Sequence, residues 1–352
     1  MINETYCGTK NDLETPPDCP VGSPSCPTTV GKEPETGGGT GVGTLDPNDP
    51  NPSLVTGGET FPHTDDPDSP WSENPTSTLP GFESDKTTSV TVVDVNGDGI
   101  DDVIVTTDGD RPSKVYINPG DGDFSGVTPT DLGPPGQETP DTSSVKVADV
   151  NGDGVPDIIV GNEDGPNHIY LGDPSNPGVY EKDPLTFGLS DDKTTDVEVV
   201  DVDGDGALDI VVANDGQPNR IYYGDPNLEP GKKPSYGSDP DQESTIGSGS
   251  GPTTSVEVVD LNGDDRVDIV FGNDGERDEI FYGSGATGTR TDLSDAQPTS
   301  VPGTESTRTT DIKVGDVTGD GIADIVIAVN GEPNLLVEGH PYDGFRSPDE
   351  IG

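Results

Sequence analysis

Short apolar runs recur along most of the chain, and turn-forming residues frame each of them. The wholly apolar runs are Val103–Val105, Ile158–Val160, Ile210–Val212, Ile269–Phe271 and Ile325–Ile327. Each follows a segment in which apolar and polar residues alternate, as in Val197-Glu-Val-Val-Asp201. Period-two alternation and β-branched residues bounded by Gly and Asn predict strands, and no segment has the helical period. The pattern therefore predicts an all-β chain.

Two further strands are expected in each copy of this pattern. An Arg-Ile-Tyr-Tyr type run follows each apolar run, and a weaker strand precedes the next Thr-Thr pair, at Leu185–Leu189, Glu243–Ile246 and Thr299–Val301. Four short strands in a unit repeated at about 55 residues predict a β-propeller of about five four-stranded blades. The tyrosines that recur in the third strands are expected to pack in the core: Tyr116, Tyr170, Tyr222, Tyr223 and Tyr282.

The two ends of the repeat region, residues 77–352, predict closure of a ring. Asn334–Glu338 supplies a third strand after the last apolar run, and the chain then ends without room for a well-formed fourth. Ser77–Phe82, which precedes the first Thr-Thr pair, stands in the position of that fourth strand. We therefore expect the segment 77–84 to complete the last blade and to remove the exposed sheet edges.

Residues 1–76 contain no copy of the repeat and consist largely of Pro, Gly, Thr, Asp and Asn. This composition is typical of a linker or stalk, or of a tether between subunits. The segment carries all three cysteines, Cys7, Cys19 and Cys26. A disulfide is their expected use, and because three is odd, one thiol remains free or pairs with another chain.

The chain is strongly acidic, with a formal net charge of -52 and only 27% hydrophobic residues. Such a charge excludes nucleic acid and anionic membranes as partners, because both need Lys and Arg. Adaptation to high salt is an alternative cause of the acidity. No apolar run approaches the roughly 18 to 20 residues that a membrane helix needs, so no membrane insertion is expected. The first residues lack a secretory signal, and we expect the true start to lie upstream.

An acidic loop of nine residues separates the alternating strand from the apolar strand in every copy. The loops begin at Asp94, Asp149, Asp201, Asp260 and Asp316, which are 55, 52, 59 and 56 residues apart. Calcium prefers six to eight oxygen ligands, and alternate residues of a short Gly-containing loop can supply them from side chains at positions 1, 3, 5 and 9 and from the carbonyl at position 7. We therefore predict about five Ca²⁺ ions. The predicted ligand residues are Asp94, Asn96, Asp98, Ile100 and Asp102 (loop 1); Asp149, Asn151, Asp153, Val155 and Asp157 (loop 2); Asp201, Asp203, Asp205, Ala207 and Asp209 (loop 3); Asp260, Asn262, Asp264, Arg266 and Asp268 (loop 4); and Asp316, Thr318, Asp320, Ile322 and Asp324 (loop 5).

Two of these loops depart from the pattern. Loop 4 has Asp265 where the others have Gly, and loop 5 has Thr318 at position 3, so both are expected to bind calcium more weakly. The alternative for all five is that Asn-Gly-Asp-Gly forms a turn without any ion. Five periodic copies favour the metal site over the turn.

The sequence holds no constellation that predicts catalysis. The three histidines, His63, His168 and His340, are scattered, and no Ser-His-Asp or Cys-His arrangement can be built from them. We therefore expect a protein that is not an enzyme.

The acidic loop followed by an apolar strand resembles the FG-GAP and VCBS-type calcium-binding repeats of integrin α-subunit propellers and of many secreted proteins. The resemblance covers about residues 77–352. It implies a β-propeller with calcium between the first two strands of each blade, exported and used in adhesion or scaffolding.

Together these features predict a non-enzymatic, extracellular, calcium-binding structural module. Residues 1–76 are expected to join copies head to tail into a homo-oligomer or filament, by adding a strand to a neighbour's sheet. The alternative is a monomeric cell-surface adhesion or carbohydrate-binding module on a flexible stalk. Both tolerate glycans, on the Asn3 sequon or on the Thr/Pro/Ser-rich stalk.

Overall fold

The computed structural model describes residues 79–81, 86–107, 111–134, 140–237, 242–247, 251–283, 297–340 and 344–345. All of them belong to one unit of the chain, Pro75–Gly352. The expectations for residues 1–76, including the cysteines and the tether, lie outside the described residues. Within the described part of the chain, no helix has the length and apolar character needed to cross a membrane.

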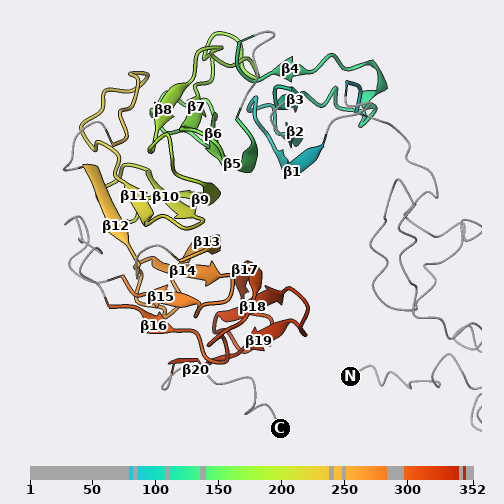
Figure 1. The fold of residues 1–352 in the computed structure, drawn as a ribbon. Coiled ribbons are helices and arrows are strands. Elements are labelled where there is room, and N and C mark those ends of the chain that lie inside the picture. The colour runs from blue at the N-terminus through green and yellow to red at the C-terminus, as the bar shows by residue number, and fades with distance from the viewer. Residues whose placement is uncertain are drawn as a thin grey trace, which may run out of the picture. The chain divides into compact units, whose positions relative to one another are not determined.

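The described chain is built from repeated antiparallel sheets (Figure 1). Sheet 1 contains β1 (Thr87–Val93), β2 (Asp102–Thr107), β3 (Lys114–Tyr116) and β4 (Thr130–Asp131). Sheet 2 contains β5 (Thr142–Ala148), β6 (Asp157–Asn162), β7 (Asn167–Tyr170) and β8 (Leu185–Phe187). Sheet 3 contains β9 (Thr194–Val200), β10 (Asp209–Asn214), β11 (Asn219–Tyr222) and β12 (Glu243–Ile246). Sheet 4 contains β13 (Thr253–Val259), β14 (Asp268–Asn273), β15 (Glu279–Phe281) and β16 (Thr299–Ser300).

The last repeat differs from the other four. Among the described residues, sheet 5 has three strands, β17 (Thr309–Gly315), β18 (Asp324–Val329) and β19 (Leu335–Val337). A small hairpin that the sequence pattern did not predict follows it, with strands β20 (Gly339–His340) and β21 (Gly344–Phe345). One turn of 3-10 helix, Phe124–Gly126, was also not predicted, and the Asp123 carboxylate caps it by accepting from the Ser125 N–H. The all-β prediction is confirmed, and the order of four strands per repeat is confirmed in the first four repeats.

The strand register places every acidic loop at the same point of its sheet. The last residue of each first strand pairs with the loop's final Asp, as in Val93 with Asp102 and Val200 with Asp209. The loop is therefore the hairpin connection between the first two strands. Since the pairing repeats in all five sheets, the five loops occupy equivalent positions.

The apolar cores lie between neighbouring sheets rather than inside one sheet. Between sheets 2 and 3, Ile159 and Ile169 of sheet 2 pack against Val197 and Ile210 of sheet 3. In the three-residue apolar run of a second strand, the middle residue packs against the following sheet. The residues on either side of it pack against the preceding sheet. Similar clusters join sheets 1 and 2, 3 and 4, and 4 and 5. A single sheet therefore cannot bury its own apolar face, which explains why the repeats must stack.

Hydroxyl groups near the start of the first strands also link neighbouring sheets. The hydroxyls of Ser143, Thr195 and Thr254 donate to backbone carbonyls of the next sheet, at 2.7, 2.9 and 2.9 Å. These first strands lie on the inner side of the row of sheets in Figure 1, where β5, β9 and β13 contact one another in turn.

The outer faces of sheets 1 and 5 lack the cover that the other sheets have. Val90 of β1 is 56% exposed, whereas the equivalent Val197 and Val256 are fully buried. Val326 of β18 is 36% exposed, whereas the equivalent Val270 is fully buried. Only Leu79–Gly81 of the predicted closing segment 77–84 is described, and the Tyr116 hydroxyl of sheet 1 donates to the Pro80 carbonyl at 2.7 Å.

Candidate metal centre

The first Asp of each loop is surrounded by backbone N–H groups of the loop itself. In loop 3, Asp201 accepts from Gly204 at 2.7 Å, from Asp205 at 3.1 Å and from Gly206 at 2.9 Å. Gly204 and Gly206 have φ values of 73° and 94°, in the left-handed region that favours glycine. The chain thus curls around this carboxylate. The same three contacts recur at Asp94, Asp260 and Asp316, and those from positions 5 and 6 recur at Asp149.

The last Asp of each loop ties the loop to the end of the third strand. Asp209 is 1% exposed, and its two oxygens accept from the N–H groups of Val202 and Gly224, both at 2.8 Å. Asp102, Asp157, Asp268 and Asp324 make the same pair of contacts. The loop pattern predicts these residues as ligands, but it indicates neither their burial nor this second role.

The Asp at position 5 uses one of its two carboxylate oxygens to accept a hydrogen bond from within the loop. The Asp205 Oδ1 accepts from the Ala207 N–H at 2.8 Å, and Asp98, Asp153, Asp264 and Asp320 do the same with the residue at position 7. At position 3, Asn96, Asn151 and Asp203 accept from the N–H of position 5. Thr318 of loop 5 instead donates its own N–H to Asp324 at 2.9 Å.

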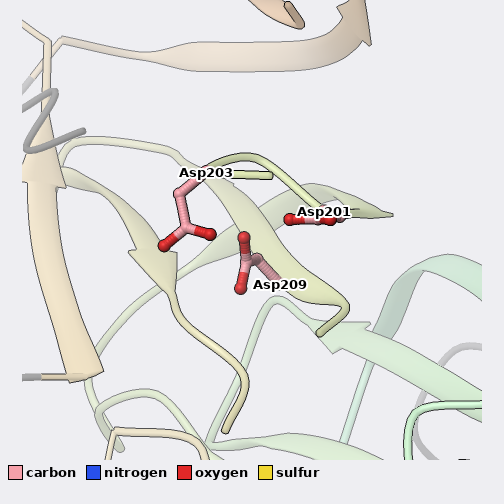
Figure 2. Close-up of side chains that lie close together, drawn as sticks. All are labelled: Asp201, Asp203 and Asp209. Carbon is pink, nitrogen blue, oxygen red and sulfur yellow. The ribbon is translucent and has the colours of Figure 1, made fainter. Parts of the chain in front are cut away.

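Three carboxylates converge in loop 3. Oxygens of Asp201, Asp203 and Asp209 all lie within 4.8 Å of one another. Figure 2 shows the three side chains gathered at this loop, with Asp203 and Asp209 turned toward one another. Oxygen donors crowded at this spacing suit a hard divalent cation such as Ca²⁺. The loop 3 residues therefore fit the ion that the sequence predicts.

Burial of the last Asp changes its protonation. Burial, reinforced by the neighbouring carboxylates of the loop, raises the pKa of Asp157 and Asp209 to about 7 and that of Asp268 to about 6. The same causes raise the pKa of Asp102. In loop 5, burial raises the pKa of Asp324 less than the N–H groups of Gly339, Thr318 and Val317 lower it, so the net shift is downward. A divalent cation would offset the repulsion that raises these values.

Loop 4 differs from the others through its own arginine. The Arg266 guanidinium binds the Asp264 carboxylate, with Nη2 2.5 Å from Oδ2, and its Nε donates to the Gly283 carbonyl at 3.3 Å. Asp265, in the place of a glycine, has a φ of 64°. Asp265 is visible as a departure in the sequence, but nothing there indicates that the side chain at position 7 turns back into the loop. The position-7 carbonyls of all five loops stay a prediction.

The two described histidines lie in different sheets. His168 packs edge-on against Tyr170, with ring centroids 5.8 Å apart, and burial lowers its pKa. His340 lies in β20, and His63 is outside the described residues. The third-strand tyrosines Tyr116, Tyr170, Tyr222 and Tyr223 are buried, which confirms their predicted place in the core.

A comparison with protein families finds the FG-GAP-like repeat at residues 94–160, 149–212, 201–271 and 260–327. Each match begins at the first Asp of an acidic loop and runs into the second strand of the next sheet. The chain belongs to the FG-GAP-like repeat family. The matched unit of an FG-GAP-like repeat thus joins parts of two neighbouring sheets and includes much of the core between them.

A search of curated proteins found no match for the chain. Among solved structures, this FG-GAP-like repeat chain is similar to the V. cholerae biofilm matrix protein Bap1, at 17% sequence identity and a TM-score of 0.40. The match covers 75% of this chain and 38% of the Bap1 chain, so this chain spans well under half the length of that protein.

Proposed function

We propose that this protein is a non-enzymatic, extracellular structural module whose FG-GAP-like repeats are held in shape by Ca²⁺ in the acidic loops. The observation that carries the proposal is the loop 3 cluster, in which three carboxylates meet within 4.8 Å at a position that recurs in every repeat. A bound ion at such a loop would hold the first two strands of a sheet and the end of its third strand together. Calcium binding would therefore stabilise the folded state.

The expected affinity supports an extracellular setting. All three carboxylates in the loop 3 cluster already accept backbone N–H groups, which leaves part of their oxygen capacity for an ion. Loops whose carboxylates share their oxygens with the backbone suit the weak end of calcium affinities, about 10⁻⁴ to 10⁻³ M, which extracellular modules use. Such sites fill where calcium is millimolar.

Thermal unfolding with and without calcium tests the proposal. The melting temperature should fall by about 10 °C or more when a chelator replaces 2 mM Ca²⁺, since clustered like charges remain without their counter-ion. Magnesium is the matched control, because it demands a small octahedral site and should restore little of the loss. Equal melting temperatures in calcium and in chelator would exclude calcium as the stabilising ion.

We further propose that the sheets close into a propeller ring of five blades. Three glycines each stand six residues before a first strand: Gly81 before β1, Gly188 before β9 and Gly247 before β13. Their φ values are similar, at 97°, 83° and 97°. In sheets 2 and 3 the residues just before these glycines form the fourth strands β8 and β12. By this parallel, we propose that the segment that ends before Gly81 would complete sheet 5, which has three strands among its described residues.

Closure would also cover the two exposed outer faces. Val90 and Val92 of sheet 1 stand where other sheets meet their predecessor, and Val326 of sheet 5 stands where other sheets meet their successor. Packing sheet 1 on sheet 5 would bury all three side chains at about 25 cal/mol per Å² of apolar surface. A chain that lacks residues 1–84 should therefore have a melting temperature several degrees lower than a chain that lacks residues 1–76 alone. Equal melting temperatures would exclude a role of residues 77–84 in closing the ring.

For residues 1–76 we propose head-to-tail assembly into a filament. The support is the composition of the segment and its three cysteines, one of which has no partner within the chain if the other two pair. Light scattering in calcium should give high-mass species for the full chain and a monomer for the chain lacking 1–76. A monomeric full chain would favour the second candidate, an adhesion or carbohydrate-binding module on a stalk.

A further inference from the structure

Loop 4 carries a positive charge where the other loops leave room for an ion. Position 7 is apolar in the others, at Ile100, Val155, Ala207 and Ile322, and is Arg266 in loop 4. All five residues donate their backbone N–H to the Asp at position 5, so the backbone of loop 4 keeps the common shape. At position 7 the difference therefore lies in the side chain.

The Arg266 side chain occupies the oxygen that an ion would use. Asp264 Oδ1 already accepts the Arg266 N–H at 3.1 Å, and its Oδ2 lies 2.5 Å from the Arg266 guanidinium. Among the described residues, the ion pairs include none to Asp153, Asp205 or Asp320, the equivalent residues of loops 2, 3 and 5. The guanidinium also donates to the Gly283 carbonyl at 3.3 Å, at the end of the third strand. A single side chain thus joins the loop to that strand end, as an ion in the loop would.

We propose that Arg266 replaces calcium in loop 4 and makes this repeat independent of the ion. The guanidinium neutralises Asp264 and links the loop to Gly283, and its charge repels a cation from the remaining ligands. Asp265 fits this role, because the loop keeps its left-handed turn without the glycine found in the other loops. The inference rests on the proposed calcium binding of the other loops, and it goes beyond the weaker affinity expected from Asp265.

Calcium bound per chain, measured by equilibrium dialysis at free calcium that saturates the wild type, tests the inference. Arg266→Ile installs the residue found in loops 1 and 5 and should add about one ion per chain. Arg308→Ile is the matched control, because Arg308 pairs with Asp274 at 3.0 Å outside the loops, and it should add none. In the wild-type background, Asp264→Asn should leave the amount of bound calcium unchanged, whereas Asp205→Asn should lower it.

The outcomes separate this inference from the proposed function. Equal, non-zero amounts of calcium on the wild type and on Arg266→Ile would overturn the inference alone, as would loss of one ion in Asp264→Asn. No bound calcium on either protein would overturn both. Hydrogen exchange gives a second measurement that does not need the Ile variant to fold: chelation should increase exchange at least tenfold in loop 3 and leave loop 4 within about twofold.

Discussion

At the scale of single residues, two of the buried positions that carry an acid among the described residues differ in their surroundings. The last Asp of each loop lies beside other carboxylates, where a cation can offset its charge. Asp278 of sheet 4 is fully buried away from the loops and accepts from the Asn273 N–H at 2.7 Å and from the Thr309 hydroxyl at 3.0 Å. At this position sheets 2 and 3 have Asn167 and Asn219, whose amides do not ionise. Asp278 is therefore a titrating residue in a structural position.

The stability of the protein should depend on pH through Asp278. Burial raises its pKa from 3.8 to about 7, so the folded state binds a proton that the unfolded state releases. This contribution is complete below pH 3.8 and is lost as the pH rises through 7, at up to about 1.4 kcal/mol per pH unit. Asp278→Asn should therefore be more stable than the wild type at pH 8 by about 1 kcal/mol or more, and the difference should disappear near pH 4.

Denaturant unfolding of both proteins in calcium at the two pH values measures this effect. Asn219→Asp is the matched control in sheet 3 and should move stability in the opposite direction at pH 8. A gap between Asp278→Asn and the wild type that stays constant across the pH range would show that Asp278 does not titrate in the folded protein.

The candidate site could be predicted from the sequence only in part. The repeated acidic spacing located all five loops and the carboxylates at positions 1, 5 and 9. It gave no sign that Asp209 would be buried, because the third strand packs beside it only in the fold. The Gly224 N–H that binds this carboxylate lies 15 residues further along the chain. It also missed the Arg266 ion pair, since position 7 was expected to contribute only a carbonyl.

At the scale of strands and sheets, hydroxyl groups near the start of the first strands hold neighbours in register. The Thr195 hydroxyl lies 2.9 Å from the Thr253 carbonyl of the next sheet and 3.2 Å from the Ala213 carbonyl of its own. Thr310 holds the equivalent place in the last sheet and contacts the Ala328 carbonyl of that sheet at 3.2 Å. Its next sheet in a closed ring would be sheet 1.

Substituting these two threonines distinguishes a closed ring from an open row. Thr195→Val should cost about 1 kcal/mol of stability, the net value of a lost hydrogen bond. In a closed ring, Thr310→Val should cost about as much, because its hydroxyl would then reach a carbonyl of sheet 1. Denaturant unfolding of each variant gives the comparison. A negligible cost for Thr310→Val would favour the open row.

The strands themselves were largely predictable from the sequence. Alternation located β9 and the other first strands, and the weak fourth strand was found at Glu243–Ile246, where β12 lies. The hairpin of β20 and β21 was missed, because two-residue strands carry no period. Which side of each strand faces the next sheet also could not be predicted, since both faces of a second strand are apolar.

At the scale of the whole molecule, the net charge of -52 opposes every compact arrangement of the chain. The described cations pair mostly between or within sheets, as in Lys146 with Glu198 and Lys313 with Glu257. Bound calcium would lower the total repulsion as well as fill the loops.

The two effects of calcium should respond differently to salt. In chelator, raising NaCl from 0.1 to 1 M shortens the screening length from about 10 to about 3 Å and should recover part of the lost melting temperature. Recovery should be less than half, because screening does not rebuild coordination in the loops. Scanning calorimetry across salt and calcium concentrations measures both parts. Full recovery by NaCl alone would mean that calcium acts only by general screening.

The placement of the cores between sheets has a mechanical consequence. A chain pulled from its two ends exposes one shared core at a time, because each sheet is held by its neighbours rather than by a core of its own. Each event would release one repeat of 52 to 59 residues, about 180 to 200 Å of extended chain. Force would thus be absorbed in nearly equal steps, and each loop would set how much tension its step can bear.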